Sequence, residues 1–299
     1  MKKLLFFVNP MAGTGTVRAG LMDILQEFAA AGYEITVHPT QGPRELSRVI
    51  AERGDRYDLI VVSGGDGTLN ETTAGLMCLP PERRRPIGYI PAGTVNDVAS
   101  TLRLKRNPLR AARDIVTGEP FPLDVGRFGD RWFNYVAAFG LFTDVSYRTP
   151  QQGKQILGRL AYLLDGAKSL VGIRSIPVTM RLDGETVEEN VLAGLVTSTT
   201  SVGGFRMKNK VGVSLNDGVF EVLLVRDIKS LADFNDAVSA LLRGELERDT
   251  FVFRRASHVE FTFPQPTDWT VDGEYGGTVT EAVIDNHRAA VQIIVPKET

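Results

Sequence analysis

Three glycine-containing segments carry groups that could bind a chain of phosphates. The most distinctive is segment 63–71, SGGDGTLNE, in which three glycines surround one carboxylate, Asp66. Glycines let the backbone approach a phosphate closely, and a helix that starts there offers N–H groups at its positive end. Segment 91–97, PAGTVND, repeats the glycine, hydroxyl, amide and carboxylate, and segment 9–13, NPMAG, is a third candidate. These residue types favour polyphosphate binding.

A tight strand-to-helix turn explains one such segment equally well, because a lone glycine-rich turn is weak evidence of function. Two such turns after neighbouring strands can converge on one polyphosphate, so the pair favours a nucleotide site. The chain lacks the lysine pattern of a P-loop. We therefore expect backbone groups and Mg²⁺ to hold the phosphates.

The elements that position these segments alternate along the first part of the chain. Apolar runs at 4–8, 34–38, 58–63 and 87–91 are separated by amphipathic stretches that predict helices. The alternation is typical of a Rossmann-like α/β domain with a parallel sheet, which binds ligands beyond the carboxyl ends of its strands.

The pattern changes after Leu123. Hairpin signals at Gly129–Asp130 and Asp183–Gly184 accompany β-rich stretches, which predicts a mostly antiparallel β-sandwich as the C-terminal domain. The predicted domains are 1–122, which segment 288–299 could complete, and 123–287.

Composition restricts the classes of function. The chain has 34 Lys and Arg residues and 36 Asp and Glu residues, so its net charge creates no positive electrostatic field that would attract nucleic acid. The single cysteine and three scattered histidines predict neither a disulfide nor a zinc site. No run approaches the roughly 20 apolar residues that cross a bilayer. We expect a cytoplasmic protein that associates with a membrane only transiently.

The NP-containing first loop, GGDGTLNE and PAGTVND together resemble the diacylglycerol kinase catalytic superfamily, which includes sphingosine kinases and bacterial soluble lipid kinases. Segments 214–220, SLNDGVF, and 271–274, VDGE, extend the resemblance to nearly the whole chain. It implies an N-terminal domain like those of NAD kinase and phosphofructokinase. It also implies transfer of phosphate from ATP, with Mg²⁺, to a lipid hydroxyl, with diacylglycerol as the default acceptor and phosphatidic acid as the product.

The resemblance also implies roles for individual residues. Glu274 would be the catalytic base, because an alcohol needs a carboxylate to accept its proton. Asp272 is the alternative, since residues two positions apart on a strand face the same side. Asp66 would orient the catalytic Mg²⁺, with Asp97 and Asp124 as weaker candidates. The implied nucleotide contacts are Asn9, Pro10, Met11, Ala12, Gly13, Thr40, Gly64, Gly65, Asp66, Gly67, Thr68, Leu69, Asn70, Gly93, Thr94 and Asn96. A structural Mg²⁺ site is implied at Ser214, Asp217 and Val219, although an NDG turn alone is more often a plain turn.

Two other functions remain open. NAD kinases share GGDGT, but their NE pair lies far downstream, whereas Asn70 and Glu71 follow the motif directly here. A catalytically silent nucleotide or lipid sensor is the other, and the presence of Asp66, Asp217 and Glu274 disfavours it.

The expected partner is a lipid substrate at the membrane surface, contacted peripherally. Segment 155–172 predicts an amphipathic helix within a basic stretch, which could meet anionic headgroups or simply cover a sheet. Soluble members of the family suggest a homodimer.

Overall fold

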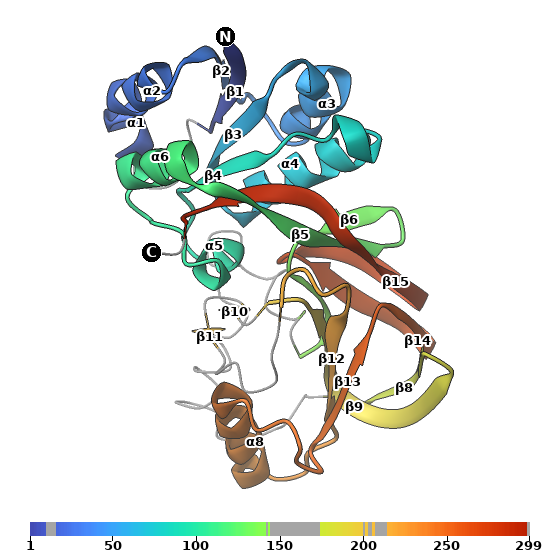
Figure 1. Cartoon of the computed structure of the whole chain (residues 1–299). Helices are drawn as coiled ribbons and strands as arrows, with labels where there is room; N and C mark the ends of the chain where they lie inside the picture. The colour runs from blue at the N-terminus through green and yellow to red at the C-terminus, as the bar shows by residue number, and fades with distance from the viewer. Residues whose placement is uncertain are drawn as a thin grey trace. The chain divides into compact units, whose positions relative to one another are not determined.

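The structure is a computed structural model that describes residues 1–9, 16–141, 143, 174–199, 201–202, 205–206 and 214–297 (Figure 1). The chain divides into two compact units: unit 1 is Met1–Val125 with Arg288–Thr299, and unit 2 is Gly126–His287. The domains predicted from the sequence have boundaries at 122/123 and 287/288, and their independence as folding domains stays a prediction.

Unit 1 is built on a parallel sheet. β1 (Lys2–Val8) lies between β2 (Tyr33–Pro39) and β3 (Leu59–Gly64), and β4 (Ile87–Pro91) lies beyond β3. The C-terminal part of β15 (Glu274–Val295) pairs with β4, also in the parallel sense. Each of the four apolar runs of the sequence analysis forms one of these strands, which confirms the predicted parallel sheet.

Helices cover both faces of this sheet. Leu4 and Phe6 of β1 pack with Phe28 on one face, and the rings of Phe6 and Phe28 are 6.0 Å apart. Because side chains alternate along a strand, Leu5 and Phe7 belong to the other face. Figure 1 shows α1, α2 and α6 on one side of the strands and α3 and α4 on the other. The helices of unit 1 are α1 (Thr16–Ala19), α2 (Leu21–Ala30), α3 (Glu45–Arg53), α4 (Asp66–Met77), α5 (Asp97–Thr101) and α6 (Pro108–Thr117), with short 3₁₀ turns η1 (Gly54–Arg56) and η2 (Pro81–Arg83).

Unit 2 is mostly antiparallel, as predicted. Its described strands pair in the order β13-β12-β9-β7-β14-β15, and β8 also pairs with β9 and β14. β5 (Glu119–Phe128) begins in unit 1 and ends in unit 2. The other elements are β6 (Arg131–Phe133), β7 (Val136–Gly140), β8 (Ile176–Leu182), β9 (Glu185–Thr197), β10 (Ser201–Val202), β11 (Phe205–Arg206), β12 (Phe220–Arg226), α8 (Leu231–Arg243), β13 (Phe251–Ala256) and β14 (His258–Val271).

The predicted two-sheet sandwich differs from the observed pairing. Apart from the β10–β11 hairpin, the described strands of unit 2 are hydrogen-bonded into one sheet. The reason is the length of β9 and β14, each of which pairs with β7 over one part and with β8 over another. The sheet therefore continues where a sandwich would have an edge.

A cluster of aromatic rings forms the core of unit 2. Trp269 is fully buried, and its ring lies 4.8 Å from Phe139, 5.0 Å from Phe128 and 5.4 Å from Phe261. These side chains come from β5, β7 and β14. The burial of so much aromatic surface is the main source of stability in this unit.

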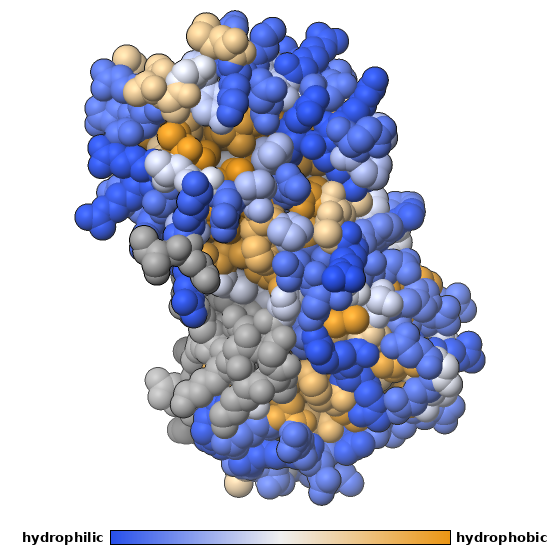
Figure 2. All heavy atoms as spheres, in the orientation of Figure 1, coloured by the Kyte–Doolittle hydropathy of each residue, from blue (hydrophilic) through white to orange (hydrophobic). Residues whose placement is uncertain are grey.

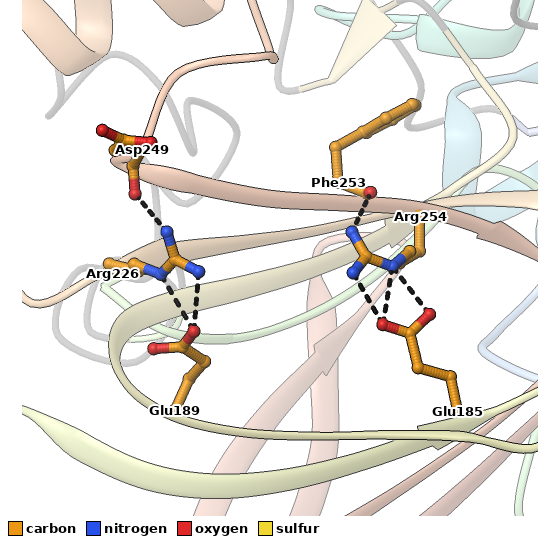
Figure 3. Close-up of polar contacts among 6 residues, drawn as sticks. All are labelled: Glu185, Glu189, Arg226, Asp249, Phe253 and Arg254. Atoms are coloured by element: carbon orange, nitrogen blue, oxygen red, sulfur yellow. Dashed lines mark hydrogen bonds and ion pairs between the residues drawn. The ribbon is translucent and has the colours of Figure 1, made fainter.

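Ion pairs link β9 to β12 and to β13 on the surface of unit 2 (Figure 3). Arg226 of β12 donates to Glu189 Oε1 at 2.7 and 3.0 Å, and Arg254 of β13 holds Glu185 with its nearest contact at 2.6 Å. All four side chains are partly exposed, so solvent screens both pairs and each adds little to the stability of the fold.

The surface is predominantly polar. On the face in Figure 2, charged and polar side chains surround separate hydrophobic patches. Among the described residues, no helix has the length and apolarity needed to cross a membrane. The predicted helix 155–172 lies outside the described residues.

Candidate functional site

The carboxyl ends of the parallel strands of unit 1 meet at one edge of the sheet. β1 connects to β2 on one side and neighbours β3 on the other, and ligands bind where strand order reverses in this way. Three backbone hydrogen bonds join neighbouring strand ends: Thr40 N to Val8 O (3.0 Å), Asn9 N to Ser63 O (3.3 Å) and Ala92 N to Gly64 O (2.7 Å). The predicted contacts Asn9, Thr40 and Gly64 are therefore brought to one edge, whereas Pro10, Met11, Ala12 and Gly13 lie outside the described residues.

The first glycine loop is short. α4 begins at Asp66, with Gly65 as its N-cap. The first helical bond runs from Leu69 N to Gly65 O (3.1 Å), so the amides of residues 66–68 precede it. These N–H groups lack acceptors within the helix and form its positive end, which suits an anion.

Gly64 is required by packing. A Cβ atom at this position would lie 2.1 Å from Thr68 Oγ1. The threonine side chain therefore folds back over the end of β3, and Thr72 Oγ1 donates to Thr68 O one turn later (2.8 Å). The glycine thus allows the loop to turn directly into α4.

The two glycine loops contact each other through their backbones. A Cβ on Gly93 would lie 2.5 Å from the Gly65 Cα, and a Cβ on Gly65 would lie 3.2 Å from the Gly93 Cα. No side chain fits at Gly93 without separating the loops. The predicted convergence of segments 63–71 and 91–97 is present in unit 1.

Asn96 ties the two loops together. It adopts the left-handed conformation (φ 58°), which asparagine tolerates better than most residues. Its side chain exchanges two hydrogen bonds with the Gly93 backbone (2.8 and 3.0 Å), and its N–H donates to Asp66 Oδ2 (2.8 Å). Asp66 is therefore oriented by the second loop. Asn96 and Asp97 are buried, and Thr94 is exposed.

A polar network fixes the turn that contains Thr40. Glu45 accepts a hydrogen bond from Gln41 N (2.6 Å) and pairs with His38 Nε2 (3.0 Å). The Gln41 N–H and His38 lower the pKa of the Glu45 carboxyl. The sequence motifs did not identify these residues, because their side chains meet only after β2 and α3 have formed.

Asp124 has a structural contact. It is buried and accepts a hydrogen bond from Ala289 N at 2.7 Å, which anchors the C-terminal part of unit 1.

In unit 2, Asp272 and Glu274 occupy different environments. We expected both carboxylates on one face of a strand, but Asp272 and Gly273 are the two turn residues between β14 and β15, both with positive φ (48° and 80°). That geometry is a type I′ hairpin, which Asp-Gly favours. The alternation of a strand therefore does not apply to this pair.

The Asp272 carboxylate accepts hydrogen bonds from three backbone N–H groups. It is buried and accepts from Asn134 N (2.7 Å), Tyr135 N (3.0 Å) and Val136 N (3.1 Å). Glu274, by contrast, is exposed at the start of β15. The geometry favours Glu274 over Asp272 as a group that could accept a proton from a bound molecule.

The predicted Mg²⁺ ligand Asp217 belongs to a charged cluster that the motifs did not reveal. Arg255 pairs with Asp217 and, at 3.3 Å, with Glu221. Glu221 is buried, and burial raises the pKa of its carboxyl to about 7 against the opposing charge of Arg255. Val219 N donates to Asp217 Oδ1 at 3.3 Å, and Ser214 Oγ to Asn216 Oδ1 at 2.8 Å.

This cluster fits a hard cation in ligand type. Mg²⁺ binds carboxylate oxygens, and the buried Glu221 carboxylate lies near that of Asp217. A cation there would take the place of Arg255 beside Asp217. No group of three or more His, Cys, Asp or Glu residues with metal-binding geometry occurs in the described part of the chain.

Unit 2 also contains an apolar pocket between α8 and the sheet. It is a small hollow whose enclosed space would hold about one water molecule. The lining residues are Leu141, Leu192, Ala193, Val225, Phe234, Ala237, Val238, Leu241 and Phe251. The lining is apolar, so the hollow offers contact to a hydrocarbon group without enclosing one.

Comparison with known proteins gives consistent similarities. Residues 3–128 match the family model of the diacylglycerol kinase catalytic domain. The chain is 34% identical to the diacylglycerol kinase of Bacillus subtilis (strain 168), over 100% of this chain and 98% of that protein. It is 31% identical to the diacylglycerol kinase of Staphylococcus carnosus (strain TM300), over 99% and 96% of the two chains. A crystal structure of a diacylglycerol kinase from Bacillus anthracis str. Sterne has the same fold, with a TM-score of 0.79 at 24% identity over 99% and 97% of the chains.

Proposed function

Because the chain belongs to the diacylglycerol kinase family, we propose that it is an ATP-dependent lipid kinase that converts diacylglycerol to phosphatidic acid. The observation that carries the proposal is the pair of glycine loops joined at Gly65 and Gly93, with Asp66 held by Asn96. The α4 N-terminus and the loop amides would bind the nucleotide phosphates. The N-terminal domain that carries these loops would have the fold of NAD kinases, as the resemblance implies.

Glu274 would accept the proton of the lipid hydroxyl. Phosphoryl transfer needs little more from the protein than positioning, compensation of charge and a group that takes this proton. Asp272 stabilises the turn between β14 and β15, so its substitution should lower the stability of the fold more than it lowers the rate of phosphoryl transfer.

Mg²⁺ would supply positive charge to the phosphates, held by Asp66, and a structural ion would bind Ser214, Asp217 and Val219. If the structural ion binds, Mg²⁺ without nucleotide should raise the Tm of the wild type but not of Asp217→Asn. An equal rise in both proteins would remove the second site.

We propose that the apolar lining between α8 and the sheet borders the acyl chains of the lipid acceptor. Ala237 is buried in the pocket, whereas Ala232 lies on the exposed side of the same helix. We expect Ala237→Phe to fill the pocket and reduce kcat/KM for long-chain diacylglycerol by roughly tenfold or more, with a smaller loss for a short-chain form. Ala232→Phe is the matched control and should leave both rates unchanged. Equal losses for both chain lengths would contradict an acyl-chain site.

The acceptor is identified by transfer of labelled phosphate from ATP in the presence of Mg²⁺. Diacylglycerol and sphingosine are offered in mixed micelles, and NAD in solution. Phosphatidic acid as the main product supports the proposal. Phosphorylated NAD would make the chain a NAD kinase, and nucleotide binding without any product would favour the silent sensor.

A further inference from the structure

Tyr89 is a buried polar residue with no role in the site described so far. It lies on β4 with 1% of its surface exposed. Its hydroxyl group is 3.3 Å from Gly64 O and 3.2 Å from Asn96 Oδ1. Gly64 leads into the first glycine loop and Asn96 belongs to the second, so one hydroxyl group contacts both loops from inside the unit.

The hydroxyl group is a donor at any working pH. Burial and the nearby charges of Asp66 and Asp97 raise the pKa of Tyr89 well above 10. The single hydrogen is therefore shared between two acceptor oxygens, one on each loop.

Neither acceptor depends on Tyr89 to be satisfied. Gly64 O also accepts from Ala92 N at 2.7 Å, and Asn96 Oδ1 also accepts from Gly93 N at 3.0 Å. Removing the hydroxyl group would leave no buried oxygen without a donor, so the cost in stability should be small. What would be lost is one of the contacts that hold the two loops at their spacing, the one that comes from a side chain of β4.

We propose that Tyr89 is a positioning residue for phosphate binding, whose hydroxyl group, together with the direct contacts between the two glycine loops, fixes their spacing. Through Asn96, whose N–H donates to Asp66 Oδ2, it also fixes the direction of the Asp66 carboxylate. The inference rests on the proposed function, because it assumes that these loops bind a nucleotide.

Tyr89→Phe tests it, since phenylalanine keeps the ring and removes only the hydroxyl group. Mg·ATP is titrated without lipid, and Kd is expected to rise roughly fivefold or more, as expected for loss of one hydrogen bond. The Tm should fall by no more than about 4 °C. Tyr33→Phe is the matched control, because Tyr33 lies in the same unit away from the loops, and its Kd should equal that of the wild type.

Amide hydrogen exchange measures how firmly the loops are held, independently of their affinity for the nucleotide. Residues 64–68 and 92–96 should exchange faster in Tyr89→Phe, with the other strands of unit 1 unchanged. A variant that binds Mg·ATP like the wild type and exchanges at the same rate would overturn the inference and leave the proposed function standing. Failure of the wild type itself to bind Mg·ATP would overturn both.

Discussion

Residues of the same chemical type have different roles in this protein because their surroundings differ. Asp272 is buried with three backbone donors, whereas Glu274, two residues later, is exposed. The first carboxylate is needed to close a hairpin, and the second is available to a substrate. The sequence VDGE alone does not distinguish them, because the turn geometry decides which carboxylate turns inward.

Asp272→Asn should destabilise the protein by about 3 kcal/mol, because an amide nitrogen would face backbone N–H groups that now donate to oxygen. Urea unfolding measures the change. Glu274→Gln is the paired variant and should stay within about 0.5 kcal/mol of the wild type, since the side chain is exposed. Equal stability of both variants would contradict the assignment of Asp272 to structure.

At the scale of elements, the site is an edge where several strand ends are locked together. The backbones of Gly65 and Gly93 bring the two loops into direct contact in unit 1. A change that separates them should weaken nucleotide binding without touching the nucleotide.

Gly93→Ala makes such a change, because the added Cβ would lie 2.5 Å from the Gly65 Cα and 2.6 Å from Asn96 Oδ1. We expect the affinity for Mg·ATP to fall by roughly tenfold or more, measured by calorimetric titration. Gly42→Ala is the control, since its added Cβ has no atom within 4 Å. Unchanged affinity in Gly93→Ala would show that the loops do not act together.

The β14–β15 pair should carry a pH-dependent part of the stability. His258 Nδ1 contacts Asp285 of β15 at 2.6 Å, and Glu260 lies 3.4 Å from its other nitrogen. The hydrogen bond with Asp285 is the main cause that raises the pKa of His258 above 6.5. Protonated His258 therefore stabilises the fold below pH 6.5, and this contribution disappears as the pH rises through the folded-state pKa.

The effect should not exceed about 1 kcal/mol, because the histidine and Asp285 are partly exposed. Urea unfolding of the wild type and His258→Gln between pH 6 and pH 9 measures it. The difference between the two proteins should shrink toward high pH. A constant difference would contradict the assignment.

Much of the element pattern could be predicted, because it depends on neighbours in the chain. The apolar runs of unit 1 gave β1 to β4, and the Asp183–Gly184 turn joins β8 to β9. The strands β8 and β13 were not predicted, and neither were Tyr89, Arg255 and Glu221 as members of the polar clusters. Their partners lie on other strands or in loops between elements, so tertiary packing decides the contact.

At the scale of the whole molecule, the chain matches curated relatives over nearly all of their length as well as its own. The features that bear on phosphates lie in unit 1, and the exposed Glu274 and the apolar pocket lie in unit 2. We therefore expect nucleotide affinity and turnover to be separable by substitutions in different units. We also propose that the protein contacts the membrane surface peripherally, where its lipid substrate lies.

The most direct test of this account measures turnover and nucleotide affinity together in Glu274→Gln. At saturating Mg·ATP and diacylglycerol, kcat should fall by about 10² or more, as expected for loss of a general base. The Kd for Mg·ATP should stay unchanged, because the groups that we propose for nucleotide binding belong to unit 1. Wild-type turnover in this variant would contradict the assignment of the catalytic base and the division of roles between the two units.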